Sequence, residues 1–247
     1  MPTSKNNLDN PQTTIDRIDT FNKNRYLKRV YSRFYAILKS NTVNLPKGKK
    51  IEIGSGAGFI KNIIPDCITS DIMRLPNCDL AFSAEKIPFK SSSLSAIYLL
   101  NTFHHIKNPK AALSEFVRCL KTGGKVIMVE PFNSIWGAFI YKNFHYEGFD
   151  EKAGWKIKGY GDLSSANNAL PWIIFVRDRK IFFKHYPKFK ILKVEPHTPF
   201  QYLVSGGFSR NSILPINTYG FISYFEKKLS FLNKYLGMFV TIVLQKK

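Results

Sequence analysis

The glycine-rich stretch Glu52-Ile53-Gly54-Ser55-Gly56-Ala57-Gly58 is the most informative part of this sequence. It overlaps an apolar segment, Ile51–Ile53, that is typical of a buried strand, and it leads into a helical-looking segment from Phe59 onward. Glycines at a strand-to-helix turn leave the backbone bare, which lets a flat nucleoside approach the edge of a sheet. The stretch therefore predicts a nucleoside-containing ligand at this turn.

Two other kinds of glycine-rich loop fit these residues less well. A dinucleotide-binding loop would have its third glycine at position 59, which is Phe59 here. A triphosphate-binding loop would continue with Gly-Lys-Ser or Gly-Lys-Thr, and neither follows Gly58. The loop therefore lacks the lysine and the hydroxyl that a triphosphate with magnesium requires.

Short apolar strands alternate with turns and helices from Lys50 to Pro131, which is the pattern of parallel βαβ units. An apolar stripe at helical spacing predicts a helix over Lys110–Lys121 that ends at Gly123-Gly124. A doubly wound α/β fold is expected. The predicted strands are Ile51–Ile53, Cys67–Ser70, Cys78–Phe82, Ala96–Leu100 and Lys125–Val129, followed after a long gap by Lys190–Val194 and Phe239–Leu244.

The rest of the chain surrounds this core. Residues 1 to about 22 are polar and are expected to be a loosely ordered lead-in, whereas Leu27–Leu38 repeats apolar residues as an amphipathic helix does. Two long insertions, Phe132–Phe189 with a helix opened by Pro171 and the aromatic-rich Pro199–Gly237, are expected to build the substrate pocket. The organisation is a tail and helix (1–45), a ligand-binding core (46–131) and substrate-side insertions with the last two strands (132–247).

Segments beyond the loop carry a resemblance to a known family. Asp71 ends the second predicted strand, Ser83–Phe89 reads Ser-Ala-Glu-Lys-Ile-Pro-Phe, and Leu120–Lys125 reads Leu-Lys-Thr-Gly-Gly-Lys. Together with the loop they resemble the class I S-adenosylmethionine-dependent methyltransferases, particularly the small-molecule enzymes whose first motif is Glu/Asp-x-Gly-x-Gly-x-Gly. The resemblance implies a Rossmann-like doubly wound seven-stranded sheet, mostly parallel with an antiparallel last strand, and helical and aromatic insertions that form a lid.

The resemblance also implies S-adenosylmethionine as the cofactor. The Asp71 carboxylate would accept hydrogen bonds from both ribose hydroxyls, and Ser83 replaces an aspartate that meets the adenine amino group. The Ser83 hydroxyl can still accept one hydrogen bond from the adenine amino group. Adenine recognition is therefore expected to be weakened but retained. The chain after the fourth strand would pass the methionine part. The predicted cofactor residues are Glu52, Gly54, Ser55, Gly56, Gly58, Asp71, Ile72, Ser83, Ala84, Glu85, Leu100 and Asn101.

Methyl transfer from a sulfonium is an in-line displacement, so a base is needed only for a protonated acceptor. His104, after the fourth strand, is the candidate base for an oxygen acceptor, with a structural role as the alternative. No metal is expected, because the imidazole and carboxylates within His145–Asp150 match no specific ligand spacing. The candidate substrate residues are Glu130, His145, Glu147, Asp150, Asn168 and Arg177.

The formal net charge of +20 attracts nucleic acid, anionic lipid or acidic substrates. The excess of Lys over Arg favours a compositional origin; an anionic membrane surface comes next, because aromatics interleave with Lys near the C-terminus, and nucleic acid is unlikely. Cys67, Cys78 and Cys119 are expected to be free thiols. Without a signal peptide or a long apolar span, the chain is expected to be cytoplasmic, with peripheral membrane attachment as the alternative. The oligomeric state stays open.

Three functions are compared. The favoured one is methylation of a small-molecule acceptor, amphipathic or lipid-linked, enclosed by the two insertions. Methylation of RNA or protein is less favoured, because Asn101 is followed by Thr102, Phe103 and His104 instead of Pro-Pro-Tyr. The third is a non-catalytic membrane-surface or partner-binding protein that retains the fold, and the intact Glu52, Asp71 and glycines argue against it.

Overall fold

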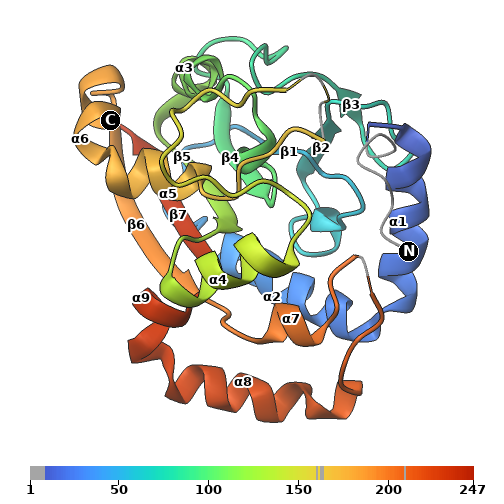
Figure 1. Cartoon of the computed structure of the whole chain (residues 1–247). Helices are drawn as coiled ribbons and strands as arrows, with labels where there is room; N and C mark the ends of the chain where they lie inside the picture. Colours follow the sequence, from blue (N-terminus) through green and yellow to red (C-terminus); the bar gives the residue numbers. More distant parts are fainter. Residues whose placement is uncertain (1–8, 160, 162–163, 209) are drawn as a thin grey trace.

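A seven-stranded sheet forms the centre of the computed structural model, which describes residues 9–159, 161, 164–208 and 210–247 (Figure 1). The strand order is β3-β2-β1-β4-β5-β7-β6, and only β7 runs antiparallel to its neighbours. The Rossmann-like, mostly parallel sheet with a reversed last strand is therefore confirmed. The strands are β1 (Lys49–Ile53), β2 (Cys67–Asp71), β3 (Leu80–Ala81), β4 (Leu94–Leu100), β5 (Leu120–Pro131), β6 (Phe189–His197) and β7 (Phe239–Lys246).

Most of the strands are longer than predicted, whereas β3 and the helix before β5 are shorter. β3 is shorter than predicted, because the Asp79 carboxylate accepts the N–H of Thr69 (Oδ2, 2.9 Å) and forms a turn where a strand was expected. The helix predicted over Lys110–Lys121 ends earlier, at Cys119, and Gly123-Gly124 lie inside β5. Gly123 has φ +82, so these glycines give β5 an irregular start and do not cap a helix.

Helices cover both faces of the sheet. On one face, α3 (Pro109–Cys119) and the chain from α5 (Leu170–Trp172) to α6 (Arg179–His185) pack against inward side chains of β1, β4 and β5. On the other face lies α2 (Arg25–Ser40), whose buried stripe contains the six apolar residues that predicted it. Asn24 caps α2 by accepting the N–H of Leu27 through Oδ1 at 2.9 Å.

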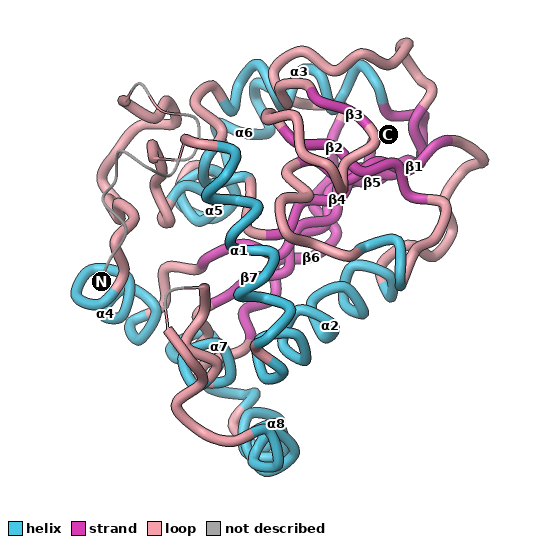
Figure 2. Tube along the Cα trace, turned by 90° about the vertical axis from the view of Figure 1, so that its right-hand side faces the viewer, coloured by secondary structure: helices cyan, strands magenta, loops and turns pink. Residues whose placement is uncertain are grey.

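The expected loosely ordered lead-in is wrong for residues 11–23. This segment forms α1 (Pro11–Lys23), capped by Asn10, with Phe21 buried against Tyr31 and Phe59. The helix was not predicted because the segment is mostly polar, and few of its side chains face the core. Residues 1–8 of the predicted lead-in lie outside the described residues. Figure 2 shows α1 crossing in front of the sheet, between the loops that follow the strands and the C-terminal helices.

The two insertions form the rest of the molecule. The first contains α4 (Ile135–Phe144), and its helix at Pro171 is divided into α5, a π-helical turn (η4, Ile173–Arg177) and α6. The single helix predicted from Pro171 to Phe182 is therefore interrupted at Asp178, which leaves helical geometry. None of the helices in the described ranges is long and apolar enough to span a bilayer. The second insertion holds α7 (Gln201–Val204), α8 (Tyr219–Lys228) and α9 (Asn233–Leu236), and single turns occur at η2 (Ile60–Asn62), η3 (Phe103–His105), η5 (Ile216–Thr218) and η6 (Ser230–Leu232).

Candidate active site

One cavity of about 780 Å³ lies over the carboxyl ends of β1, β2 and β4. Its floor is the glycine-rich loop, and its walls come from α1, α2, α4 and the loop before α5. In parallel α/β sheets this is the edge at which ligands bind. The cavity is large enough for a nucleoside cofactor together with a second small molecule.

The glycines of the loop have distinct roles. Gly54 has φ +71, and a side chain there would collide with the side chain of Thr102. Gly58 is held against the Tyr35 hydroxyl and the Ser55 carbonyl, so a side chain there would also collide. Gly56 differs, because a methyl group at this position would meet no protein atom and the position lines the cavity. The backbone at Gly56 therefore leaves room for a ligand to lie directly against it.

Asp71 ends β2 beside this bare backbone and lines the cavity. Its Oδ2 accepts the N–H of Gly56 at 3.0 Å, and its Oδ1 accepts the N–H of Met73 at 3.1 Å. Burial raises the pKa of this carboxyl, although the backbone N–H groups work in the opposite direction. Each oxygen keeps a further lone pair, so the carboxylate can accept two more hydrogen bonds from a vicinal diol.

Asn101 follows β4 in a left-handed conformation (φ +52) and lines the cavity next to Leu100. Its Nδ2 donates to the Tyr31 hydroxyl at 3.3 Å, whereas its buried Oδ1 has no partner among the described residues. A buried acceptor without a donor is costly unless a ligand supplies one. An ammonium group, such as that of a methionine moiety, would satisfy it.

Ile72, Ser83 and Ala84 line the cavity on the side of β2 and β3, as predicted for an adenine site. Glu85 also lines it, but its Oε1 accepts the N–H of Asn108 at 2.9 Å and so fixes the start of α3. Phe82, which the sequence did not single out, adds an aromatic wall. The open backbone at Gly56, the Asp71 carboxylate, the unpaired Asn101 oxygen and this apolar wall together fit S-adenosylmethionine.

Glu52 stands behind the loop and does not line the cavity. Its side chain is 1% exposed, and burial raises its pKa to about 7. Ser55 lines the cavity, and its Oγ accepts the N–H of Ser70 at 3.2 Å. Direct contact of Glu52 with the cofactor was predicted from the motif, but its side chain is buried behind the loop and outside the cavity lining.

At the other end of the cavity, a polar cluster gathers around Glu147. His104 Nε2 lies 3.4 Å from Glu147 Oε2, and His105 Nε2 lies 3.6 Å from Glu147 Oε1. On its far side, His104 Nδ1 lies 2.7 Å from Glu130 Oε2. Glu130 also accepts the N–H groups of Thr102 and Phe103, so it holds the whole η3 turn in place.

The cluster shifts the pKa values of its members. Burial alone would lower the pKa of His104, but hydrogen bonds with Glu130 and Glu147 outweigh it and raise that pKa to about 9. Burial, together with the charge of His104, lowers the pKa of His105 to about 4. Burial would raise the pKa of Glu147, but the imidazoles of His105 and His104 hold it well below its usual range. Such strongly perturbed groups in a cavity are typical of a functional site.

Three of the six predicted substrate residues, His145, Glu147 and Asn168, line the cavity. The other three do not, and their expected contact with substrate needs correction. Glu130 is fully buried beneath η3, and Asp150 binds the N–H of Lys152 in its own loop at 2.9 Å. Arg177 holds the outer loop through the carbonyls of Glu151 and Ala153 and pairs with Asp178.

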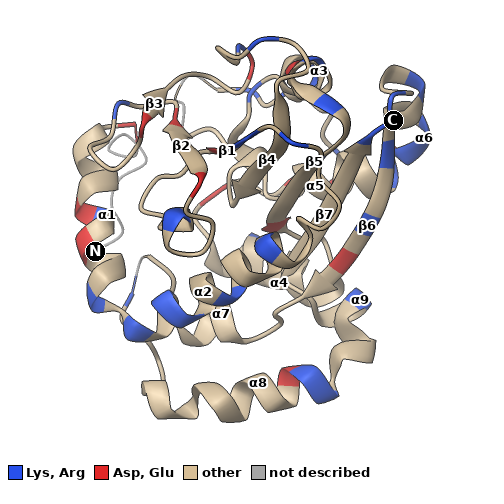
Figure 3. Cartoon of the chain, turned by 180° about the vertical axis from the view of Figure 1, so that it is seen from behind, with Lys and Arg blue, Asp and Glu red and all other residues tan. Residues whose placement is uncertain are grey.

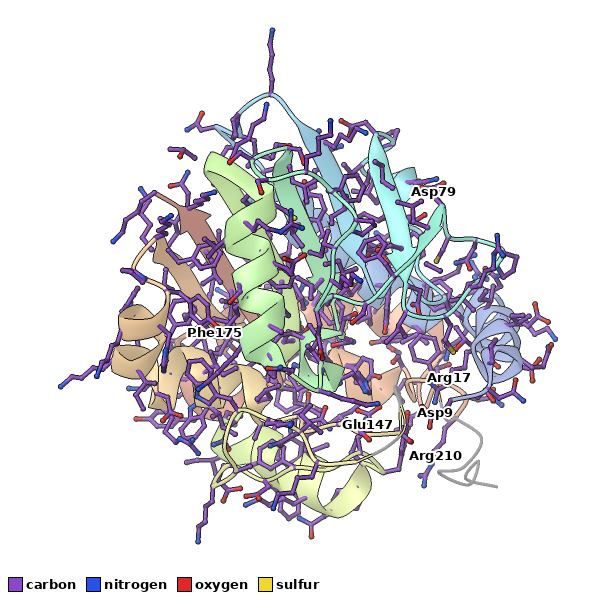
Figure 4. All side chains as sticks on the ribbon, turned by 90° about the horizontal axis from the view of Figure 1, so that it is seen from above. Asp9, Arg17, Asp79, Glu147, Phe175 and Arg210 are labelled. Atoms are coloured by element: carbon purple, nitrogen blue, oxygen red, sulfur yellow. The ribbon has the colours of Figure 1, made fainter. Side chains whose placement is uncertain are left out.

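Several cavity residues were missed by sequence reasoning. Arg17 of α1 lines the mouth, and its Nη2 donates to the Tyr146 hydroxyl at 3.0 Å. Figure 4 shows the labelled Arg17, Arg210 and Glu147 on the same side of the molecule. The spacing of the aromatic residues was the only sequence signal that could have located these cavity residues. That spacing indicates which side of α2 is buried, but it does not indicate which aromatic side chains border a cavity. The other missed lining residues include Thr14, Tyr31, Tyr35, Trp136, Phe139, Phe144, Tyr202 and Phe208.

The reversed β7 in an otherwise parallel sheet, with a nucleoside-sized hollow over β1 and β2, defines the class I S-adenosylmethionine-dependent methyltransferases. Residues 51–128 match a family model described as "Methyltransferase domain". This match and the fold together support an S-adenosylmethionine-dependent methyltransferase, with S-adenosylmethionine as its cofactor. The matched stretch contains the glycine-rich loop, Asp71 and the η3 turn.

Solved structures share this fold at low sequence identity. A Thermotoga maritima S-adenosylmethionine-dependent methyltransferase, described as a possible histamine N-methyltransferase, is 20% identical (TM-score 0.52; 93% of this chain and 99% of that chain). Geranyl diphosphate C-methyltransferase from Streptomyces coelicolor, bound to Mg²⁺, geranyl diphosphate and S-adenosyl-L-homocysteine, is 11% identical (TM-score 0.54; 90% and 82%). A methyltransferase from Archaeoglobus fulgidus is 14% identical (TM-score 0.52; 88% and 94%). No curated protein matches the chain.

Proposed function

We propose that this methyltransferase acts on a small amphipathic or lipid-linked acceptor that it receives at an anionic membrane surface. The observation that carries the proposal is the two-sided character of the cavity. Its inner end is polar, at His104, His105 and Glu147, whereas its outer wall is aromatic, at Phe139 and Phe144 of α4. A molecule with one polar end and one apolar body fits such a cavity.

The aromatic wall continues onto the outer surface. Phe144 is 72% exposed and Phe139 is 50% exposed, although both line the cavity, so the apolar lining reaches solvent through α4. Phe221 of α8 and Phe231 of η6 extend the exposed apolar surface, at 67% and 73% exposure. Exposed aromatics at the rim of a cavity, such as Phe139 and Phe144, are suited to contact with a membrane or a partner.

Basic side chains accompany these aromatics. Lys142 belongs to α4, Lys227 and Lys228 end α8, and the ammonium group of Lys234 lies 4.6 Å from the Tyr235 ring centroid. Aromatic and basic residues together are suited to the interface of an anionic bilayer, where each Lys contributes about 1 kcal/mol. Figure 3 shows Lys and Arg residues spread over several elements of the chain.

Within the cavity, S-adenosylmethionine supplies an activated methyl group when it is bound. The residues of the chain supply position: Asp71 and Asn101 orient the cofactor, and the polar cluster fixes the reacting end of the acceptor in line with it. Glu130 holds His104 in its rotamer through Nδ1. For a hydroxyl acceptor our candidate base is His104, which lines this end of the cavity together with Glu147. Because the pKa of His104 is raised to about 9, it must lose its own proton before it can accept that of the hydroxyl.

The acceptor class is tested by supplying radiolabelled S-adenosylmethionine and a cell extract, then separating organic-soluble lipids, water-soluble small molecules, RNA and protein. We expect the label in the organic-soluble fraction, and none in that fraction with Asp71→Asn. Label in RNA or protein would refute the small-molecule assignment. If no fraction of the extract becomes labelled although the protein binds S-adenosylhomocysteine, the result would favour the non-catalytic alternative.

The membrane surface is tested by flotation with phosphatidylserine-containing vesicles. We expect binding at low salt that high salt reverses, and a loss of binding in Phe144→Asp and Phe231→Asp. Ile181→Asp is the matched control, because Ile181 is also an exposed apolar side chain but lies on α6. Equal loss in all three variants would show that these aromatics do not form a specific membrane contact.

A further inference from the structure

We propose that His104, His105 and Glu147 form a binding site for a divalent first-row transition metal at the inner end of the cavity. The three residues offer one ligand atom each, and these atoms lie within 4.8 Å of one another. Two imidazoles and one carboxylate are a ligand set suited to Zn²⁺ or Fe²⁺. The proposal deepens the proposed function, because it names what would hold the reacting end of the acceptor.

The distances favour a shared metal over a direct ion pair. A charge-assisted N–H···O bond has a length of about 2.7–2.9 Å, as the His104–Glu130 contact does at 2.7 Å. The two contacts of Glu147, at 3.4 Å and 3.6 Å, are longer than that. Ligand atoms of a tetrahedral site with bonds of about 2.0–2.2 Å lie about 3.3–3.5 Å apart. The two contacts use different oxygens of Glu147, Oε2 toward His104 and Oε1 toward His105, so the carboxylate faces both imidazoles at separations compatible with a metal held between them.

The residues behind the ligands also match a metal site. A histidine that binds a metal through one ring nitrogen usually donates a hydrogen bond from its other ring N–H to a carboxylate. Glu130 is such a partner for His104 Nδ1. Asn168 Nδ2 lies 3.4 Å from Glu147 Oε2 and orients the carboxylate from the other side. The fully buried carboxylate of Glu130 and the carboxylate of Glu147, which is 11% exposed, supply the negative charge that a dication needs.

His145 is excluded from the ligand set although it is close. Its Nδ1 lies 3.8 Å from Glu147 Oε2, but the same nitrogen accepts the N–H of Glu147 at 3.3 Å. A site with three protein ligands leaves positions open, and all three ligands line the cavity. An acceptor oxygen could occupy an open position, where a metal lowers the pKa of a bound hydroxyl. The earlier expectation of no metal considered only the 145–150 segment, without the two histidines after β4.

The test uses untagged protein that has been treated with a chelator and dialysed. Co²⁺ is titrated in while the visible absorption is recorded, and the Zn²⁺ content is measured after equilibrium dialysis. We expect one metal per chain, with His105→Ala and Glu147→Gln each weakening binding by at least about tenfold. His185→Ala and Glu151→Gln are matched controls that should keep wild-type affinity, since they remove the same chemical groups outside the cavity.

Binding of S-adenosylhomocysteine by each variant shows that it is folded. Wild-type protein that binds no Co²⁺ or Zn²⁺ at micromolar concentration, or ligand variants that bind as well as the controls, would overturn the proposal. Neither result depends on the identity of the acceptor. The proposed metal site and the proposed acceptor class are therefore tested independently of each other.

Discussion

Asp71 is the residue on which cofactor affinity depends most directly, because its two oxygens are held by the N–H groups of Gly56 and Met73 and keep lone pairs free. In Asp71→Asn, one oxygen becomes an N–H₂ donor, and one hydroxyl of a bound diol loses its acceptor. We expect affinity for S-adenosylhomocysteine to fall about 10- to 100-fold, measured by isothermal titration. Asp66→Asn, which changes an exposed carboxyl at the start of β2, should have no effect.

Glu52 gives the stability of the protein a specific pH dependence. Its pKa rises from 4.5 to about 7 on folding because the carboxyl is buried. The folded state therefore binds the proton more tightly, so the associated stability is present below pH 4.5 and is lost as the pH rises through 7. Between pH 5 and pH 8, wild-type protein should lose roughly 2–3 kcal/mol of unfolding free energy more than Glu52→Gln, as measured in urea. Parallel pH curves for the two proteins would contradict this assignment.

At the scale of elements, α1 was not predicted, because the sequence signal for a helix is its apolar stripe and α1 buries only Thr14 and Phe21. The strands and α2 were predictable because their apolar patterns are strong. The polar cluster was not, since His104 and Glu147 come together through an irregular loop whose course no local pattern encodes. The sequence motifs indicated the residues expected to bind the cofactor. The polar cluster around Glu147 is formed by tertiary packing, which no sequence motif indicates.

Phe21 attaches α1 to the molecule through its contacts with Tyr31, Phe59 and Phe208. In Phe21→Ala the helix should detach at least in part, because a buried aromatic contributes about 3–5 kcal/mol. We expect faster tryptic cleavage near Lys23 and weaker binding of S-adenosylhomocysteine. Asp19→Ala, an exposed change on the same helix, should leave both measurements unchanged. Normal protease resistance in Phe21→Ala would mean that other contacts hold α1.

At the scale of the whole molecule, the cavity joins segments from almost the entire chain, from Thr14 to Phe239. A ligand bound there should stabilise the fold globally. At 100 times its dissociation constant, S-adenosylhomocysteine adds about 2.7 kcal/mol, which for a chain of this size should raise the melting temperature by about 5–10 °C. In Asp71→Asn at the same ligand concentration, an affinity weakened 10- to 100-fold should reduce the added free energy to about 0.4–1.4 kcal/mol and the shift in proportion. An unchanged melting temperature in the wild-type protein at this ligand concentration would contradict the assigned cofactor site.

The hydrogen bond between Arg17 and Tyr146 has a consequence for the timing of catalysis. It joins α1 to the loop that carries Glu147 and so closes the chain around the cavity mouth. We infer that spent cofactor leaves past this contact, with Asn24 between α1 and α2 as the hinge. We expect departure of the by-product to be slower than transfer itself. Rapid-mixing experiments should then show a burst of methylated product in the first turnover, and Arg17→Ala should raise the steady rate that follows.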